Sequence, residues 1–333
     1  MQDPDIERHP RTRGWLLAAL LTTACGDDGG AGEGSAESTD ASTSAGSAAS
    51  EATSADASTG ASTGSSAAES TSADASTSDG ETSADGDSTG GGAATPIVLV
   101  HGAWMGGWAW DEVVPLLEDA GHPTIVVELP AHGDDATAAA DATLASYRDA
   151  VLDALDGLEA PAAVVGHSMG GMVISEVAEA RPAAIATLVY VAAFLPRDGQ
   201  ALFDIASTDP DSITAMHLVD HGDGTASIDP AFIGDVFCGD CSEAAVQTIV
   251  DRTRPEPLAP LLTPASLTEA AFGTVARTYV HTELDAAVSL AAQEAMVAAT
   301  PVDEVRSLAT AHSPFLSQPQ MLADTLVELV ETR

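Results

Sequence analysis

The pentapeptide Gly166-His167-Ser168-Met169-Gly170 decides the fold because of the two segments that flank it. The run before it, 162–165, is Ala-Ala-Val-Val, which is short and apolar and predicts a buried strand. Residues 171–181 after it predict a helix. A serine between a strand and a helix lies on a sharp turn, where only small neighbours fit and where the helix N-terminus presents free N–H groups. The pattern therefore predicts that Ser168 is a nucleophile, and the alternative is a purely structural turn.

Strands and helices alternate along the sequence on both sides of this turn. Short apolar runs predict strands at 96–100, 124–127, 163–165, 185–191, 275–281 and 303–308. Apolar residues at helical spacing predict helices at 110–120, 144–155, 171–180, 290–299 and 319–330. This order predicts the α/β fold class, with a mainly parallel sheet and helices on both faces, in a domain over residues 96–333.

The alternation breaks at about residues 196–274, where Pro, Gly and Asp are scattered among short apolar runs. We expect this segment to be an inserted cap, small and mostly helical, with one helix at Glu243–Arg252. The pattern of the core returns at residue 275.

Composition separates residues 26–95 from the rest of the chain. They are almost entirely Ser, Thr, Ala, Gly, Asp and Glu, without an aromatic residue or arginine. Such a segment cannot bury enough apolar surface to offset the entropy of ordering it, so we expect a disordered acidic tether. The chain has a formal net charge of −40, and its 11 basic residues are all arginine. We expect no nucleic-acid partner, because binding phosphates requires a basic surface.

Residues 1–25 have the features of an export signal. Three arginines precede an apolar core at Trp15–Leu21, which is too short to span a bilayer. The sequence Ala24-Cys25-Gly26 follows and resembles bacterial lipoprotein signals, in which the cysteine becomes the lipidated first residue of the mature protein. We expect an exported protein that meets a membrane only through a lipid on Cys25, facing the periplasm or the cell exterior. An ordinary cleaved secretory signal is the alternative.

Cys238 and Cys241 form a C-x-x-C pair in an irregular stretch of the expected cap. A redox pair is expected at the start of a helix near a βαβ unit, which this stretch does not predict. Two cysteines are too few for a zinc site, and no histidine pair at ligand spacing accompanies them. In an oxidising compartment the pair predicts a local disulfide, and we expect no metal site.

A serine nucleophile needs a base that accepts its proton and an acid that orients this base. In doubly wound enzymes of this kind the acid and then the histidine follow the serine along the chain. Of the four histidines after Ser168, only His312 follows a late strand and precedes the final helix, so it is the predicted base. The acid is expected directly after the preceding strand, where Asp285 and Glu283 both fit. Asp303 fits less well because it precedes a strand.

Acyl transfer also requires two N–H donors for the oxyanion of its intermediate. We predict the N–H of Met169, which follows the nucleophile, and the N–H of Ala103, in the loop after the first strand of the domain. Apolar residues near these positions are candidates for a substrate pocket or for ordinary core: Trp104, Met105, Phe194 and Leu195.

Longer stretches of the domain resemble one branch of the α/β-hydrolase superfamily, which contains plant methyl-ester esterases, hydroxynitrile lyases and related bacterial esterases. The likeness is carried by Val98-Leu99-Val100-His101-Gly102-Ala103-Trp104, by the pentapeptide with its flanks, by Val189-Tyr190-Val191-Ala192-Ala193-Phe194-Leu195-Pro196, and by His312-Ser313-Pro314-Phe315. It implies an α/β-hydrolase fold and a cofactor-free serine hydrolase that acts on small carboxylic esters beneath a compact cap. The family spacing from the strand of Tyr279 supports Asp285 over Glu283 as the acid.

The chain departs from this family pattern at two positions. Met105 stands where many relatives have histidine, and Ala131 replaces a usual glycine. A carbon–carbon lyase of the hydroxynitrile lyase type is one alternative function, but those enzymes use a lysine beside the catalytic histidine, where this chain has Ser313. A non-catalytic surface binding protein on the same fold is another alternative. The sequence does not indicate an oligomeric state.

Overall fold

The computed structural model describes residues 94–332. The expected signal peptide, Cys25 and nearly all of the expected tether lie outside these residues. A six-stranded sheet has the strand order β2-β1-β3-β4-β8-β9, and all of its neighbouring strands are parallel. Its strands are β1 (Ile97–Val100), β2 (Thr124–Val127), β3 (Ala162–His167), β4 (Ile185–Val191), β8 (Arg277–Thr282) and β9 (Glu304–Leu308).

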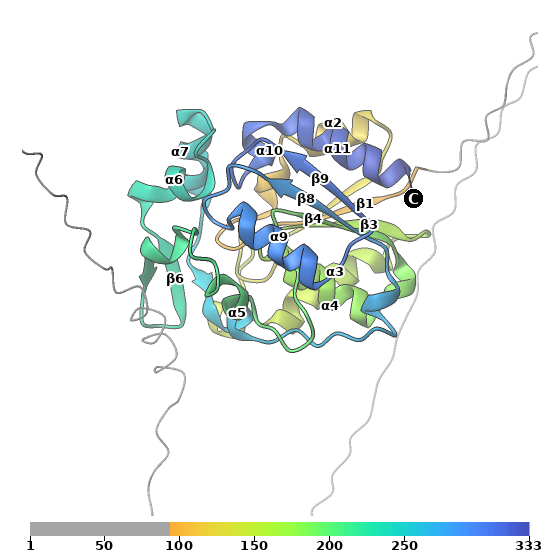
Figure 1. Cartoon of the computed structure of the whole chain (residues 1–333), viewed down its shortest axis with the longest axis horizontal. Helices are drawn as coiled ribbons and strands as arrows, with labels where there is room; N and C mark the ends of the chain where they lie inside the picture. Colours follow the sequence, from red (N-terminus) through yellow and green to blue (C-terminus); the bar gives the residue numbers. More distant parts are fainter. Residues whose placement is uncertain (1–93, 333) are drawn as a thin grey trace, which may run out of the picture. The chain divides into compact units, whose positions relative to one another are not determined.

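Helices cover both faces of this sheet (Figure 1). One layer contains α2 (Val114–Asp119), α10 (Pro314–Ser317) and α11 (Pro319–Glu331), and the other contains α3 (Leu144–Asp156), α4 (Gly170–Ala180) and α9 (Leu290–Ala299). Every residue of β1 and β3 is buried, as strands covered on both faces require. The prediction of an α/β class with a mainly parallel sheet is confirmed. Among the described residues, no helix has the length and apolar character that crossing a membrane requires.

The helix predicted at 110–120 is shorter in the structure. Residues Gly107–Trp110 form the 3₁₀ turn η1, and α2 begins only at Val114. Pro115 has no N–H with which to continue a helix from Trp110, but the first turn of a new helix does not need that N–H. The proline therefore sets the start of α2.

Residues 196–274 lie between β4 and β8 and are less purely helical than predicted. They contain the helices α5 (Leu202–Ala206), α6 (Ile233–Phe237), α7 (Glu243–Arg252) and α8 (Leu258–Leu262), and α7 has the predicted bounds. They also contain an antiparallel sheet of β5 (Leu218–Asp220), β6 (Thr225–Ile228) and β7 (Glu256–Pro257), which the sequence did not predict. These strands are too short to show the alternation of apolar and polar residues by which strands are recognised. The remaining 3₁₀ turns are η2 (Ala139–Asp141), η3 (Pro182–Ala184), η4 (Thr214–Met216), η5 (Pro230–Phe232) and η6 (Phe272–Thr274).

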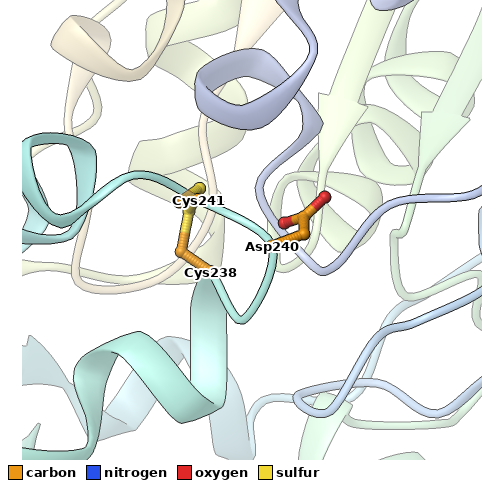
Figure 2. A group of neighbouring side chains, drawn as sticks. All are labelled: Cys238, Asp240 and Cys241. Carbon is orange, nitrogen blue, oxygen red and sulfur yellow. A yellow bond between two sulfur atoms is a disulfide. The ribbon is translucent and has the colours of Figure 1, made fainter.

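Cys238 and Cys241 form a disulfide between the end of α6 and the start of α7 (Figure 2). Their Cα atoms are 5.1 Å apart, within the usual range for a disulfide. Together with Asp240 they are the one group of three potential metal ligands in the part of the chain that the structure describes, but the disulfide uses both sulfur atoms. The cross-link fixes the segment that follows Phe237, the last residue of α6.

The strand order places a ligand-binding position at one edge of the main sheet. β1 lies between β2 and β3, so the chain leaves β1 in opposite directions, and such sheets bind ligands at the carboxyl ends of these strands. The parallel strands β8 and β9 end at the same edge. The loops after four strands carry the candidate residues: Ala103 after β1, Ser168 after β3, Asp285 after β8 and His312 after β9.

Candidate active site

Ser168 lies on a strained turn between β3 and α4. Its φ angle is 52°, in the left-handed region that residues other than glycine rarely adopt. The turn is held by its backbone, because the Ser168 carbonyl accepts hydrogen bonds from the N–H groups of Gly171 and Phe194, each at 3.0 Å. A Cβ atom at Gly170 would lie 2.8 Å from the carbonyl oxygen of Val100, so only glycine fits there. The local sequence thus determines a turn that holds the serine at the edge of the sheet.

His312 and Asp285 form a buried pair at the same edge. The distance from His312 Nδ1 to Asp285 Oδ2 is 2.7 Å, and the two residues are 1% and 8% exposed. A carboxylate only accepts hydrogen bonds, so Nδ1 carries a proton and donates it to Asp285. In the neutral ring Nε2 is then the nitrogen that can accept a proton.

Asp285 is held in place by four further donors. Its Oδ1 accepts from the N–H groups of Ala287 and Val288 at 2.8 Å each, and its Oδ2 accepts from the Thr282 hydroxyl at 2.8 Å. The amide nitrogen of Gln293, a fully buried residue of α9, lies 3.3 Å from the same oxygen. These contacts fix the orientation of the carboxylate toward the imidazole ring.

The rival acids lie elsewhere. Glu283 is exposed, and the structure brings no histidine to it. Asp303 is exposed and accepts a hydrogen bond from the N–H of Arg277, at the first residue of β8 and therefore at the opposite edge of the sheet. The geometry thus brings Asp285, and not its rivals, to His312.

His167, the residue before the serine, links the turn to His312. Its Nε2 lies 2.8 Å from the His312 carbonyl oxygen and donates a proton to it. Complete burial lowers the pKa of His167 well below its ordinary value, and the nearby His312 ring lowers it further. His167 is therefore a neutral packing residue that brings the chain at His312 against the turn of Ser168.

The two predicted oxyanion donors lie on either side of Ser168. A Cβ atom at Gly102 would lie 2.8 Å from the Cβ of Ser168, so the loop that carries Ala103 packs directly against the serine. Met169 follows the serine and is the N-cap residue of α4. Within residues 94–332, neither the Ala103 N–H nor the Met169 N–H has a hydrogen-bond acceptor. Both N–H groups are therefore available to an anion at the serine.

Two aromatic residues separate His312 from a cavity in the cap. The ring of Phe237 lies 5.9 Å from the ring of His312 and 5.6 Å from the ring of Trp104, measured between centroids. The far side of this pair faces a cavity of about 280 Å³. Its lining is mostly apolar and includes Trp104, Val219, Ile228, Ile233, Phe237 and Val250.

The structure does not bring the four predicted pocket residues together. Trp104 lines the cavity described above, whereas Leu195 lines a second cavity, of about 330 Å³, beside α5 and α9. Met105 and Phe194 are buried and line neither of these two cavities. The sequence analysis missed Phe237 and Gln293, because apolar and amide residues in helices are ordinary and only tertiary contacts reveal their position.

A second buried network, also missed, lies behind the Ala103 loop. Glu256 of β7 is fully buried, and its Oε2 lies 2.7 Å from the backbone nitrogen of Trp104 and 2.8 Å from His132 Nε2. Its one signal in the sequence is an acid between two prolines, Pro255 and Pro257.

Comparison with known proteins agrees with this geometry. The model of the alpha/beta hydrolase family matches residues 97–325. Putative methylesterase 15, chloroplastic, from Arabidopsis thaliana is 31% identical over 70% of this chain and 56% of its own length. Methylesterase 9 from the same plant is 28% identical over 70% of this chain and 97% of its own length. The present chain thus spans just over half the length of the first of these relatives and nearly all of the second.

Solved structures show the same fold. A pyrethroid hydrolase from Sphingobium faniae JZ-2 superposes with a TM-score of 0.64, at 26% identity, over 72% of this chain and 98% of its own. Polyneuridine aldehyde esterase superposes with a TM-score of 0.66, at 23% identity, over 71% of this chain and 99% of its own. The chain belongs to the alpha/beta hydrolase family, in the branch that contains the plant methylesterases.

Proposed function

We propose that this protein is a serine hydrolase that cleaves small carboxylic esters through an acyl-enzyme intermediate. The observation that carries the proposal is the 2.7 Å contact between His312 and Asp285, at the sheet edge where Ser168 lies on its strained turn. The relatives named methylesterase, esterase and pyrethroid hydrolase support ester substrates. The carbon–carbon lyase alternative is not favoured, since no observation points to it.

In the proposed mechanism Ser168 Oγ attacks the ester carbonyl carbon while His312 Nε2 accepts the hydroxyl proton. The carbonyl π electrons become the oxyanion, which the N–H groups of Ala103 and Met169 stabilise. Asp285 holds the ring and stabilises the imidazolium. His312 then protonates the departing alcohol, and a water molecule, deprotonated by the same ring, releases the acid and restores Ser168.

We further propose that the cavity beside Trp104 and Phe237 receives the larger apolar group of the ester. Its apolar lining suits an alkyl or aryl group, and Phe237 joins the cavity to the ring of His312. The indole N–H of Trp104 donates to the Ala226 carbonyl at 2.9 Å, which fixes one wall of the cavity.

The proposed function is tested with p-nitrophenyl acetate. Ser168→Ala and His312→Ala remove the nucleophile and the base, so each should lower kcat by about 10⁴-fold or more. Glu283→Gln changes an exposed acid that has no place in the mechanism and should leave kcat unchanged. Full activity in either alanine variant would contradict the proposal.

We also propose that the protein is exported and anchored through a lipid on Cys25. The basic and apolar segment before Cys25 supports this proposal. The disulfide between Cys238 and Cys241 also supports it, because disulfides persist in oxidising compartments.

A further inference from the structure

The loop that carries the Ala103 N–H is held from the cap. Trp104, the next residue, has a φ angle of 62°, a left-handed conformation that costs a bulky residue free energy and persists only when its surroundings impose it. The backbone N–H of Trp104 donates to Glu256 Oε2 at 2.7 Å, and its carbonyl accepts from the N–H of Arg254 at 2.9 Å. Both backbone polar groups of this strained residue are therefore bound by one cap segment, 254–256.

Glu256 has a second partner that balances its charge. His132 Nε2 lies 2.8 Å from Glu256 Oε2, and His132 Nδ1 lies 3.0 Å from the Pro130 carbonyl oxygen. Because both ring nitrogens face acceptors, both carry protons and the ring is an imidazolium. Burial lowers the pKa of His132, but the Glu256 carboxylate outweighs burial and raises it. The imidazolium thus offsets a negative charge that would otherwise oppose an oxyanion nearby.

Resting on the proposed function, we propose that Glu256 is a positioning residue for catalysis. Its Oε2 holds the N–H of Trp104 and thereby keeps the adjoining Ala103 N–H directed at the oxyanion. A loop free of this contact relaxes from its left-handed conformation and turns the Ala103 N–H away. The role requires an acceptor atom at the correct distance, and it does not require the negative charge.

Three substitutions separate reach from charge. Glu256→Gln keeps the length and a carbonyl oxygen for the Trp104 N–H but removes the charge. Glu256→Asp keeps the charge for His132 but is one methylene shorter and withdraws the acceptor. Glu256→Ala removes both. We expect kcat of the Gln variant within about threefold of wild type, and kcat of the Asp and Ala variants lowered by at least about tenfold, toward the hundredfold loss of an oxyanion donor. The KM values should change less than about threefold.

A second readout reports on the oxyanion itself. A phenethyl trifluoromethyl ketone forms a tetrahedral adduct when Ser168 Oγ bonds to its carbonyl carbon, the hydroxyl proton passes to His312 and the π electrons become an oxyanion. The alcohol obtained by reducing this ketone forms no adduct. The Asp variant should lose affinity for the ketone by the same factor as kcat/KM and keep its affinity for the alcohol.

The outcomes distinguish the two proposals. All rates are normalised to the sites titrated by a fluorophosphonate, so partial unfolding does not count as lost catalysis, and the Gln and Asp variants suffice if Glu256→Ala does not fold. Inactive wild-type protein would overturn the proposed function. Active wild type with the Asp variant faster than the Gln variant, or with ketone and alcohol affinities lowered equally, would overturn the role of Glu256 in positioning the loop.

Discussion

At the residue scale, backbone strain is concentrated at the site. Among the described residues, the non-glycine residues with positive φ angles are Trp104, Ala131, Ser168 and Ala192. They follow β1, β2, β3 and β4 respectively, each within four residues of the end of its strand. Such strain persists only where surrounding structure imposes it, and it is typical of functional sites. The sequence could predict it at Ser168, where the glycine pattern is visible, but not at Trp104, whose partners come from the cap.

Ala131 is a test of this strain. Its φ angle is 66°, whereas buried Ala142 has a φ angle of −75°. Ala131→Gly and Ala142→Gly each remove one buried methyl group, but only the first relieves a left-handed conformation. We expect Ala131→Gly to cost less unfolding free energy than Ala142→Gly by about 1–2 kcal/mol, measured by urea denaturation. Equal costs would show that Ala131 is unstrained.

His167 should make stability depend on pH. Burial lowers its folded pKa well below the ordinary value of 6.5, so the unfolded chain binds a proton that the folded chain excludes. The stability from this group is present above pH 6.5 and is lost as the pH falls below it. Between about pH 6 and 5, His167→Gln should reduce the slope of the unfolding free energy against pH by up to about 1.4 kcal/mol per unit.

Glutamine keeps a donor for the His312 carbonyl, so this comparison isolates the protonation of His167. The slope should not vanish, because burial also lowers the pKa of His101. Identical slopes for wild type and His167→Gln in urea denaturation would show that His167 accepts a proton in the folded protein.

At the element scale, the sequence predicted the parts of the fold that local patterns determine. The bounds of α7, α9 and β4 match the prediction, because apolar periodicity and the residues at their ends are both local signals. The sheet β5-β6-β7 was missed because its strands are short and pair through contacts distant in sequence. Glu256 was missed for the same reason, since its partners lie 124 and 152 residues away. The order of serine, acid and histidine could be predicted because parallel strands bring their carboxyl ends to one edge.

The cap should determine which esters are accepted. Val219 of β5 is 42% exposed and lines the cavity beside Phe237, so tryptophan there should fill part of the cavity without disturbing the core. We expect Val219→Trp to raise KM for methyl hexanoate by about tenfold, equivalent to about 1.4 kcal/mol, and to leave KM for methyl acetate unchanged. The rates are followed in a pH-stat.

Met321→Trp is the matched control. Met321 lies on α11, is 46% exposed and does not line the cavity, so this variant should resemble wild type with both esters. Unchanged selectivity in Val219→Trp would place the substrate outside this cavity.

At the scale of the whole molecule, the chain combines a hydrolase-family domain with an acidic segment of different composition. The proposed anchor makes a direct prediction, because a lipid-modified N-terminus with several acyl chains binds membranes durably. Expressed in a bacterial host with labelled palmitate, the wild-type protein should carry label and sediment with membranes. Cys25→Ser should carry no label and remain in the soluble or periplasmic fraction. Sedimentation of both proteins alike, or wild type without label, would contradict the anchor.

The central claim is that Ser168 is a nucleophile activated by His312. Its most direct test is mass spectrometry of the full chain after treatment with a fluorophosphonate, which bonds to an activated serine and releases fluoride. The account predicts one adduct, on the peptide that contains Ser168, with loss of esterase activity in proportion to labelling and far slower labelling in His312→Ala. An active protein labelled on another residue, or left unlabelled at Ser168, would contradict the account.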